Sequence, residues 1–346
     1  MRNINYNSKK AICSICIIMV LWTLVVTGAT LPPDPDNAAL LYYQAFLLLP
    51  DPNMNLINPV LDGAEPDEKV REYIEDAHEA IELAEAAAKI PDCTWGIIYS
   101  QGLVPNLPQL EQCHYLTNIL NVEARILTAD GDYRAALEKC LTIRRLAQHI
   151  GNDTLLSYML SLDVDTNAQN CIKYILGIMP SDIDILIWLQ NQLFLWQGSS
   201  LSLTQLAQTL EMDFQLKLQS IRINPTNISL IRDHFVQNPG KYGSADVVLN
   251  LTDEDIVVLA GEPYNDFLNS VIRVFGSEMP YEEKYTELQR LTEDLEVEYS
   301  SYPTVVQIVI FCADYVLPLY SHNVQLISRM NALRAAVEIY IRGVSI

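Results

Sequence analysis

The stretch ADGDYRAALEKC at residues 129–140 decides the fold class of this chain. On both sides of it, apolar residues recur at three- and four-residue steps, which is typical of amphipathic helices. Asp130, Gly131 and Asp132 provide the residue types of a tight turn between them. The apolar stripes consist of Leu110, Cys113, Leu116, Leu120, Ala124 and Leu127 before the turn, and Tyr133, Ala136, Leu137, Cys140, Leu141, Ala147 and Ile150 after it. We therefore predict a helical hairpin at about 119–150.

The same helical pattern extends through most of the chain. No segment shows the sustained two-residue alternation of a half-buried strand. We predict an all-α fold, an array of antiparallel helical hairpins preceded by one N-terminal hydrophobic helix. The expected helices after that one cover 37–49, 66–89, 108–129, 133–150, 154–176, 182–196, 203–223, 253–275, 281–299, 303–317 and 319–341.

The first thirty residues have the layout of an export signal or a membrane anchor. Arg2, Lys9 and Lys10 precede nineteen uncharged residues, 11–29 (AICSICIIMVLWTLVVTGA). A basic start followed by an apolar run is expected to leave its basic end in the cytoplasm. Nineteen residues are long enough to span a bilayer, whereas small residues at 27–29 also fit a cleavage site. We expect the rest of the chain outside the cytoplasm, either anchored in the inner membrane or secreted.

Proline and glycine mark one further division. Pro225, Pro239, Gly240 and Gly243 lie close together, which predicts a loop or a domain seam. The expected organisation is a signal peptide or membrane anchor at 1–30, a helical domain at 31–223, a loop or seam at 224–250, and a C-terminal helical region at 251–346.

Charge excludes some classes of partner. The chain has 43 acidic and 22 basic residues and a net charge of −21. Three of the basic residues belong to the leader, so the remainder is more acidic still, at −24. Such a surface repels phosphate backbones and anionic lipid headgroups, so nucleic-acid binding is not expected.

Five cysteines follow the leader, and none of their spacings matches a zinc site. In an oxidising compartment Cys93 and Cys113 are the best candidates for a disulfide, because they flank one long irregular stretch. The other interpretation, which stays open, is a set of small buried thiols that pack as hydrophobic residues.

The segment at 129–140 resembles the turn and second helix of a tetratricopeptide repeat, in which Gly-Asp-Tyr makes the turn and small alanines allow close helix packing. The resemblance covers about 119–150. It implies an α-solenoid-like stack of hairpins, of which this chain shows one clear copy.

A second resemblance covers nearly the whole chain after the leader. It is carried by residues 36–46 (DNAALLYYQAF), 93–96 (CTWG), 107–110 (LPQL), 131–133 (GDY), 144–147 (RRLA) and 331–340 (NALRAAVEIY). On these stretches the chain resembles a family of uncharacterised, signal- or anchor-bearing helical proteins of the bacterial cell envelope. The resemblance implies an envelope location and implies no activity. In that family a Gly-x-x-Pro segment usually follows the last helix, so a C-terminal part is expected to be missing here.

Catalytic and metal-binding motifs are not found in the sequence. The motifs of serine hydrolases and of nucleotide-binding proteins do not occur, and the five histidines lack metal-ligand spacing. Asp163 and Asp165 are two residues apart and so face different ways on a helix. We expect no cofactor, no metal and no catalytic residue.

The irregular stretch at 93–107 is the strongest candidate for a binding site. Trp95, Ile98 and Tyr99 could contact a ligand or peptide, because loops on rigid scaffolds often carry function. The alternative is that Trp95 plugs the end of the helical stack.

We therefore expect a non-enzymatic interaction scaffold in the cell envelope, with a protein or peptide partner. The alternative is an all-α hydrolase or lyase that acts on envelope polysaccharide or peptidoglycan.

Overall fold

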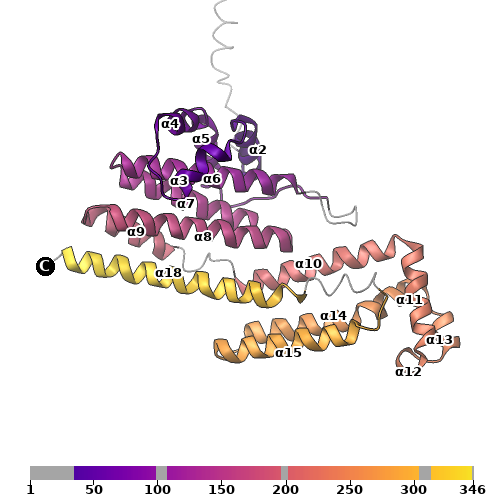
Figure 1. The fold of residues 1–346 in the computed structure, drawn as a ribbon. Helices are drawn as coiled ribbons and strands as arrows, with labels where there is room; N and C mark the ends of the chain where they lie inside the picture. The colour runs from indigo at the N-terminus through magenta and orange to yellow at the C-terminus, as the bar shows by residue number, and fades with distance from the viewer. Residues whose placement is uncertain (1–34, 99–106, 196–201, 304–312, 345–346) are drawn as a thin grey trace, which may run out of the picture. The chain divides into compact units, whose positions relative to one another are not determined.

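The computed structural model describes residues 35–98, 107–195, 202–303 and 313–344. Within these ranges all regular elements are helices and no strand occurs, which confirms the all-α class (Figure 1). The expected N-terminal hydrophobic helix lies outside the described residues. The helices are α2 (Ala38–Leu48), α3 (Met54–Leu61), α4 (Glu68–Glu75), α5 (His78–Ala87), α6 (Pro108–Ala129), α7 (Tyr133–Ile150), α8 (Leu155–Ile178), α9 (Ile183–Leu195), α10 (Leu203–Arg222), α11 (Pro225–Gln237), α12 (Pro239–Tyr242), α13 (Ala245–Leu249), α14 (Asp253–Gly276), α15 (Tyr281–Tyr299) and α18 (Val316–Val344).

Side-chain caps fix where several of these helices begin. The Asp132 carboxylate accepts a hydrogen bond from the Ala135 amide at 3.1 Å and caps α7. Thr252 and Asp255 form a reciprocal capping box at the start of α14. Asn37 caps α2 by accepting from the Ala39 amide at 3.1 Å.

The turn between α6 and α7 needs a glycine. Gly131 has a φ of +84°, a backbone conformation that residues with a Cβ rarely adopt. The amides of Gly131 and Asp132 donate hydrogen bonds to the carbonyls of Thr128 and Leu127, respectively. These bonds provide partners for carbonyl groups in the last turn of α6 that have none within the helix. The predicted hairpin is therefore present, with its turn at 130–132.

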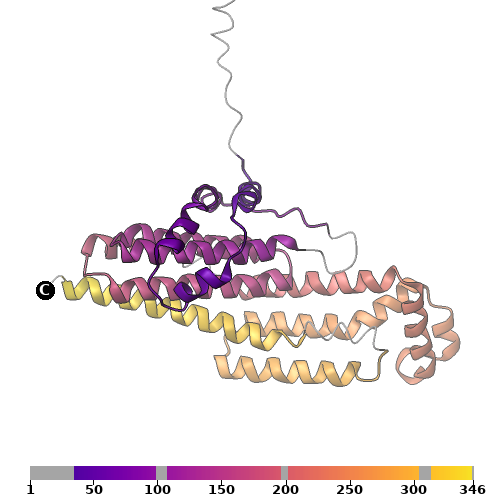
Figure 2. The same cartoon turned by 45° about the horizontal axis from the view of Figure 1, so that its top comes forward.

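Three hydrophobic cores hold the helices together. The first lies among α2 to α8, and the second lies among α6, α7, α8, α9 and the second half of α18. The third joins the start of α8 to α10, α11, α13, α14, α15 and the start of α18. Helices α6, α7 and α8 each pack against the other two, and α2 packs against α5 (Figure 2).

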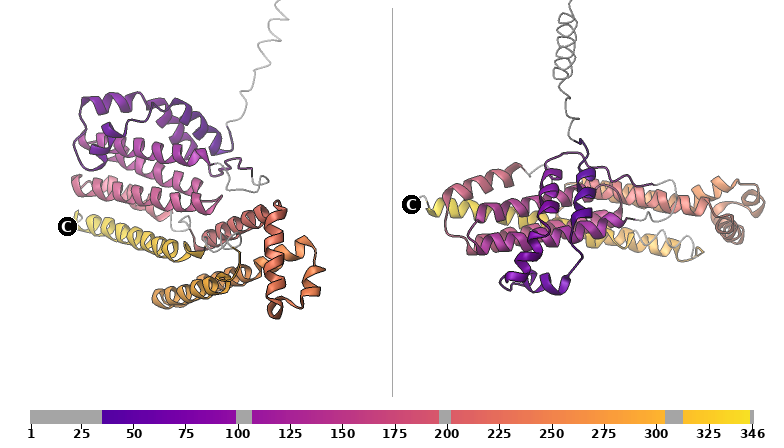
Figure 3. Two further views of the ribbon diagram at one scale, coloured as in Figure 1. Left: turned by 45° about the vertical axis from the view of Figure 1, so that its right-hand side comes forward. Right: turned by 90° about the horizontal axis from the view of Figure 1, so that it is seen from above.

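Helix α18 connects the second and third cores. It packs against α8 and α9 and also against α15 and α10 (Figure 3). Residues from Asn37 onward group as one compact unit.

The segment at 224–250 is helical, which differs from the expected loop or seam. Asn224 caps α11 by accepting from the Thr226 amide, and Pro225 occupies the first helical position, where a missing N–H costs nothing. Phe235 and its neighbours in α11 are buried in the third core. Pro225 and Pro239 lie at helix starts, and Gly243 follows the end of α12.

None of the helices within the described ranges combines the length and the apolar character that a bilayer crossing requires. The apolar leader is not among those ranges.

We predict that Gly131→Ala lowers the free energy of unfolding by about 1 kcal/mol, because alanine is strained at positive φ. Gly177 is the matched control, since it lies within α8, has no positive φ and has open space at its Cβ. Gly177→Ala should leave stability unchanged or raise it by about 0.5 kcal/mol. Urea unfolding measures both, and equal losses would contradict the role of the turn.

Candidate functional site

A groove of about 300 Å³ lies where α5, α7 and α9 meet. Its lining combines both signs of charge with an indole ring and an amide, which is the composition of a recognition surface. The lining residues are Glu85, Lys89, Glu138, Leu141, Thr142, Arg145, Trp188 and Gln192. We call this the α5–α7–α9 groove.

A cluster of ion-paired side chains next to the groove holds one of its walls in place. Lys139 Nζ lies 2.6 Å from Glu85 Oε1 and 3.2 Å from Glu123 Oε2, so it links α7 to both α5 and α6. Burial raises the pKa of the Glu123 carboxyl, and Lys139 opposes that shift. Burial alone would lower the pKa of Lys139, but the two glutamates outweigh it and raise the pKa. The cluster is thus paired internally and holds Glu85 in place.

The indole of Trp188 is held from one side. The Arg134 guanidinium carbon lies 4.8 Å from the centre of the Trp188 ring, a cation–π arrangement. Arg134 also lies 3.5 Å from the Glu138 carboxylate, one turn further along α7. The aromatic and acidic sides of the groove are therefore joined through one arginine.

A larger hollow of about 650 Å³ lies between α14 and α15. Its lining includes Arg273 and Arg290, and Arg290 already pairs with Glu287 and Asp294 through side chains that are exposed to solvent. Exposed pairs of this kind contribute little to binding or stability. We therefore take the smaller groove as the candidate site.

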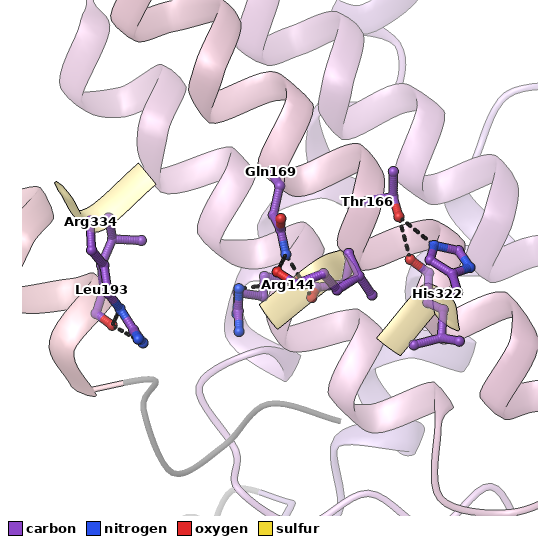
Figure 4. Close-up of polar contacts among 9 residues, drawn as sticks. Arg144, Thr166, Gln169, Leu193, His322 and Arg334 are labelled. Carbon is purple, nitrogen blue, oxygen red and sulfur yellow. Dashed lines mark hydrogen bonds and ion pairs between the residues drawn. The ribbon is translucent and has the colours of Figure 1, made fainter. Parts of the chain in front are cut away.

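A second polar group lies in the protein interior, where α18 meets α7, α8 and α9 (Figure 4). Arg144 and Asp165 are 2% and 5% exposed, and their charged atoms lie 3.4 Å apart. Gln169 donates to Asp165 Oδ2 at 3.2 Å and to the Leu326 carbonyl of α18 at 3.4 Å. We call these residues, together with the α18 contacts described next, the polar seam.

The remaining contacts of the polar seam come from α18. Arg334 donates from Nη2 to the Leu193 carbonyl of α9 at 2.8 Å. Thr166 Oγ1 donates its proton to Leu162 and lies 3.0 Å from His322 Nε2, so His322 is the donor in that pair. These bonds tie α18 to α8 and α9.

The part of the polar seam formed by Arg144, Asp165 and Gln169 is closed to solvent. Burial lowers the pKa of Arg144 and raises the pKa of Asp165, and each residue opposes the shift of the other. A substrate cannot reach a buried pair of this kind. The role of the pair is to hold α7 against α8, and Gln169 links the pair to α18.

Of the three loop residues predicted from the sequence, the structure describes Trp95 and Ile98. Trp95 is 4% exposed, and its ring stacks on that of Tyr42 with centroids 5.5 Å apart. Its Nε1 donates to the His149 carbonyl at 2.9 Å. Trp95 is thus a core residue, as in the plug interpretation. Ile98 is 61% exposed, and Tyr99 lies outside the described residues.

Cys93 and Cys113 are free thiols that belong to the same part of the first core. Burial raises the pKa of Cys93 to about 12 and holds the pKa of Cys113 well above its usual value. Neither is an ionised nucleophile at neutral pH. The predicted disulfide between them stays a prediction.

The aspartates of α8 face different ways, as their spacing predicted. Asp165 is buried in the polar seam, whereas Asp163 is exposed. Over the part of the chain that the structure describes, no group of three or more histidine, cysteine or acidic residues is placed to hold a metal ion.

Sequence reasoning did not single out the groove residues. They come from three helices more than forty residues apart along the chain, and no local motif connects them. The sequence feature that could have indicated this region is the basic pair Arg144-Arg145, which lies within an apolar helical segment. Consecutive helix residues point about 100° apart, so the two arginines face different surroundings.

We predict that Lys139→Met lowers the free energy of unfolding by about 2 kcal/mol at pH 7, because it leaves Glu123 buried without its cation. The folded-state pKa of Glu123 would then rise further above its unfolded value. The folded protein binds that proton more tightly, so stability is regained as the pH falls and is lost as it rises. Urea unfolding at pH 7 and pH 5 should therefore show a smaller loss at pH 5. The control Lys139→Arg keeps the charge, and a pH-independent loss would show that only packing had changed.

We also predict that Asp165→Leu costs about 3 kcal/mol of stability, because Arg144 is left charged and buried without an acidic partner. Adding Arg144→Met should recover most of that loss, since both buried charges are then removed. A double-mutant cycle measured by thermal unfolding gives the coupling between the two positions. Additive losses would show that the pair is not coupled.

No protein-family model, curated protein or solved structure matches this chain. The resemblances to tetratricopeptide repeats and to the envelope family therefore stay predictions.

Proposed function

We propose that this protein is a non-enzymatic helical scaffold of the cell envelope that binds a protein or peptide segment in the α5–α7–α9 groove. The observation that carries the proposal is the lining of that groove. Lys89 and Arg145 stand beside Glu85 and Glu138, with Trp188 completing the surface. A partner with both acidic and basic side chains matches this arrangement.

The chemistry of the groove favours a polypeptide over other ligands. Its mixed charge does not suit a phosphate backbone, and the net charge of −21 opposes one. Trp and Arg, which are both present, are the residues most enriched at energetically important contacts between proteins. Gln192 adds an amide that can pair with a peptide backbone.

The groove is also pre-organised. Lys139 connects α5, α6 and α7 through its two ion pairs, so one wall of the groove is set before any partner arrives. A preformed site loses less conformational entropy on binding than a flexible one.

We further interpret α6, α7 and α8 as a tetratricopeptide-like unit. The glycine turn at 131 and the packing of each of these helices against the other two support this interpretation. Stacks of this type bind peptides on their helical faces. The envelope location depends on the leader sequence at 11–29, which predicts export with or without cleavage.

A hydrolase or lyase for envelope polysaccharide or peptidoglycan is the second candidate. Glu85 and Glu138 place two carboxylates beside the aromatic ring of Trp188 in one groove. Glycoside hydrolysis uses two carboxylates, one of them as a general acid. Soluble fragments released from purified peptidoglycan by the protein, but not by Glu138→Gln, would favour this alternative.

The test is affinity purification of the tagged full chain from membranes, followed by mass spectrometry. We expect Trp188→Ala to reduce recovery of a specific partner by about thirtyfold, which corresponds to about 2 kcal/mol for a central aromatic contact. Arg145→Glu should reduce it as well, because it reverses the charge of the groove wall.

Lys173→Glu is the matched control. It makes the same charge change at an exposed position of α8 that does not line the groove. The same partner recovered equally with all variants would exclude the groove as its site, and no reproducible partner at all would overturn the scaffold proposal. Thermal unfolding of each variant separates loss of binding from loss of fold.

A further inference from the structure

Helix α2 is apolar over most of its surface, and Gln44 is its one amide side chain. Its eleven residues, AALLYYQAFLL, include no charged side chain. One face, formed by Ala38, Ala39, Tyr42 and Ala45, is buried. A helix that is hydrophobic all round is normally covered on every side, either by protein or by lipid. The face of α2 that the protein leaves exposed therefore needs a contact with protein or lipid.

That exposed face carries large apolar side chains. Leu40, Tyr43 and Leu47 follow one another at three- and four-residue steps, and Leu48 lies beside them. The exposed amide side chain of Gln44 lies among these four apolar residues. Leu47 is 84% exposed, among the highest values for a large apolar side chain in the described residues. The Tyr43 hydroxyl donates to the Trp95 carbonyl at 2.8 Å, so its polar end already has a partner. We call these four residues the outer stripe of α2.

The outer stripe is tethered close to the predicted anchor. Asn37, the cap of α2, follows Ala29 by eight residues, which reach at most about 28 Å when fully extended. We propose that the outer stripe lies in the interfacial layer of the same bilayer that holds the leader. This inference rests on the anchored form of the proposed function.

The lipid chemistry follows from the flanks of the helix. Asp36 precedes α2 and Asp51 follows it, and no basic residue lies between Lys10 and Asp51. Amphipathic helices that bind anionic lipids carry lysine and arginine on their polar face. The outer stripe therefore suits a zwitterionic surface, in which its leucines and tyrosine enter the boundary between headgroups and acyl chains.

The size of the stripe argues against a second copy of the chain as its cover. Eleven helical residues are about 16 Å long, and a helix face is about 10 Å wide. A stable protein–protein interface buries about 800 Å² on each partner, several times this area. Shallow insertion into a bilayer has no such minimum, because the tether has already brought the helix to the surface.

The experiment places a photo-crosslinking residue at single positions of the full chain, reconstituted in phosphatidylcholine vesicles. Leu47→p-benzoylphenylalanine tests the outer stripe. Val297→p-benzoylphenylalanine is the matched control, since Val297 is also an apolar helix residue, 74% exposed, in α15. Leu21→p-benzoylphenylalanine reports separately whether the leader is inserted.

We expect lipid adducts at position 47 to exceed those at position 297 by roughly tenfold, because only a residue at the headgroup boundary meets acyl chains. Equal labelling at 47 and 297, or adducts at 47 with a second copy or with the leader, would overturn the inference. If position 21 labels lipid and position 47 does not, the anchor stands and the interfacial helix fails. If neither labels lipid, the anchored location itself fails.

Discussion

The placement of α18 against α8 is the constraint on which the rest of the described fold depends. The first part of α18 belongs to the core shared by α10, α14 and α15, and its second half belongs to the core shared by α7, α8 and α9. Apolar packing alone tolerates sliding of one helix along another. The polar seam restricts such sliding, because Gln169 and Thr166 of α8 bond to Leu326 and His322 of α18, and Arg334 of α18 bonds to the Leu193 carbonyl of α9. We interpret the seam as the feature that selects one position of α18.

Helix α7 separates this structural role from the proposed recognition role. Arg144 and Arg145 are consecutive, so their side chains leave the helix about 100° apart. Arg144 meets Asp165 in the interior, whereas Arg145 lines the groove beside Trp188. The two arginines are equivalent in the sequence and differ only in what surrounds them. A buried arginine with one acid can only hold helices together, while a partly exposed arginine in a mixed-charge groove can exchange water for a partner.

The parts of the fold that local chemistry determines could be predicted from the sequence, and the rest could not. The bounds of α6, α14 and α15 follow from a first-turn proline, a capping box and apolar periodicity, and they agree with the predictions. By contrast, α3 was not predicted, because its eight residues are too few for an apolar periodicity to be recognised. Residues 66–89 were predicted as one helix, whereas the chain forms two helices there, with a break at Asp76-Ala77. The candidate groove was out of reach for a different reason. It forms where α5, α7 and α9 meet, so it depends on how the helices pack and not on the sequence of any one segment. Trp95, by contrast, was selected because it lies in an irregular stretch, but three neighbouring aromatic rings bury it.

Helix α5 connects the two surfaces for which we propose a function. It packs against α2, and its buried residues Ala80, Ala84 and Ala87 are small enough for two helices to approach closely. From the same helix, Glu85 reaches the groove and is held there by Lys139 of α7. A close helix pair moves as one body, because a densely packed interior transmits displacement without absorbing it. If α2 lies at a bilayer surface as proposed, the groove wall on α5 is fixed relative to that surface as well, and a partner bound there is presented at a defined height above the membrane without any contact of its own with lipid.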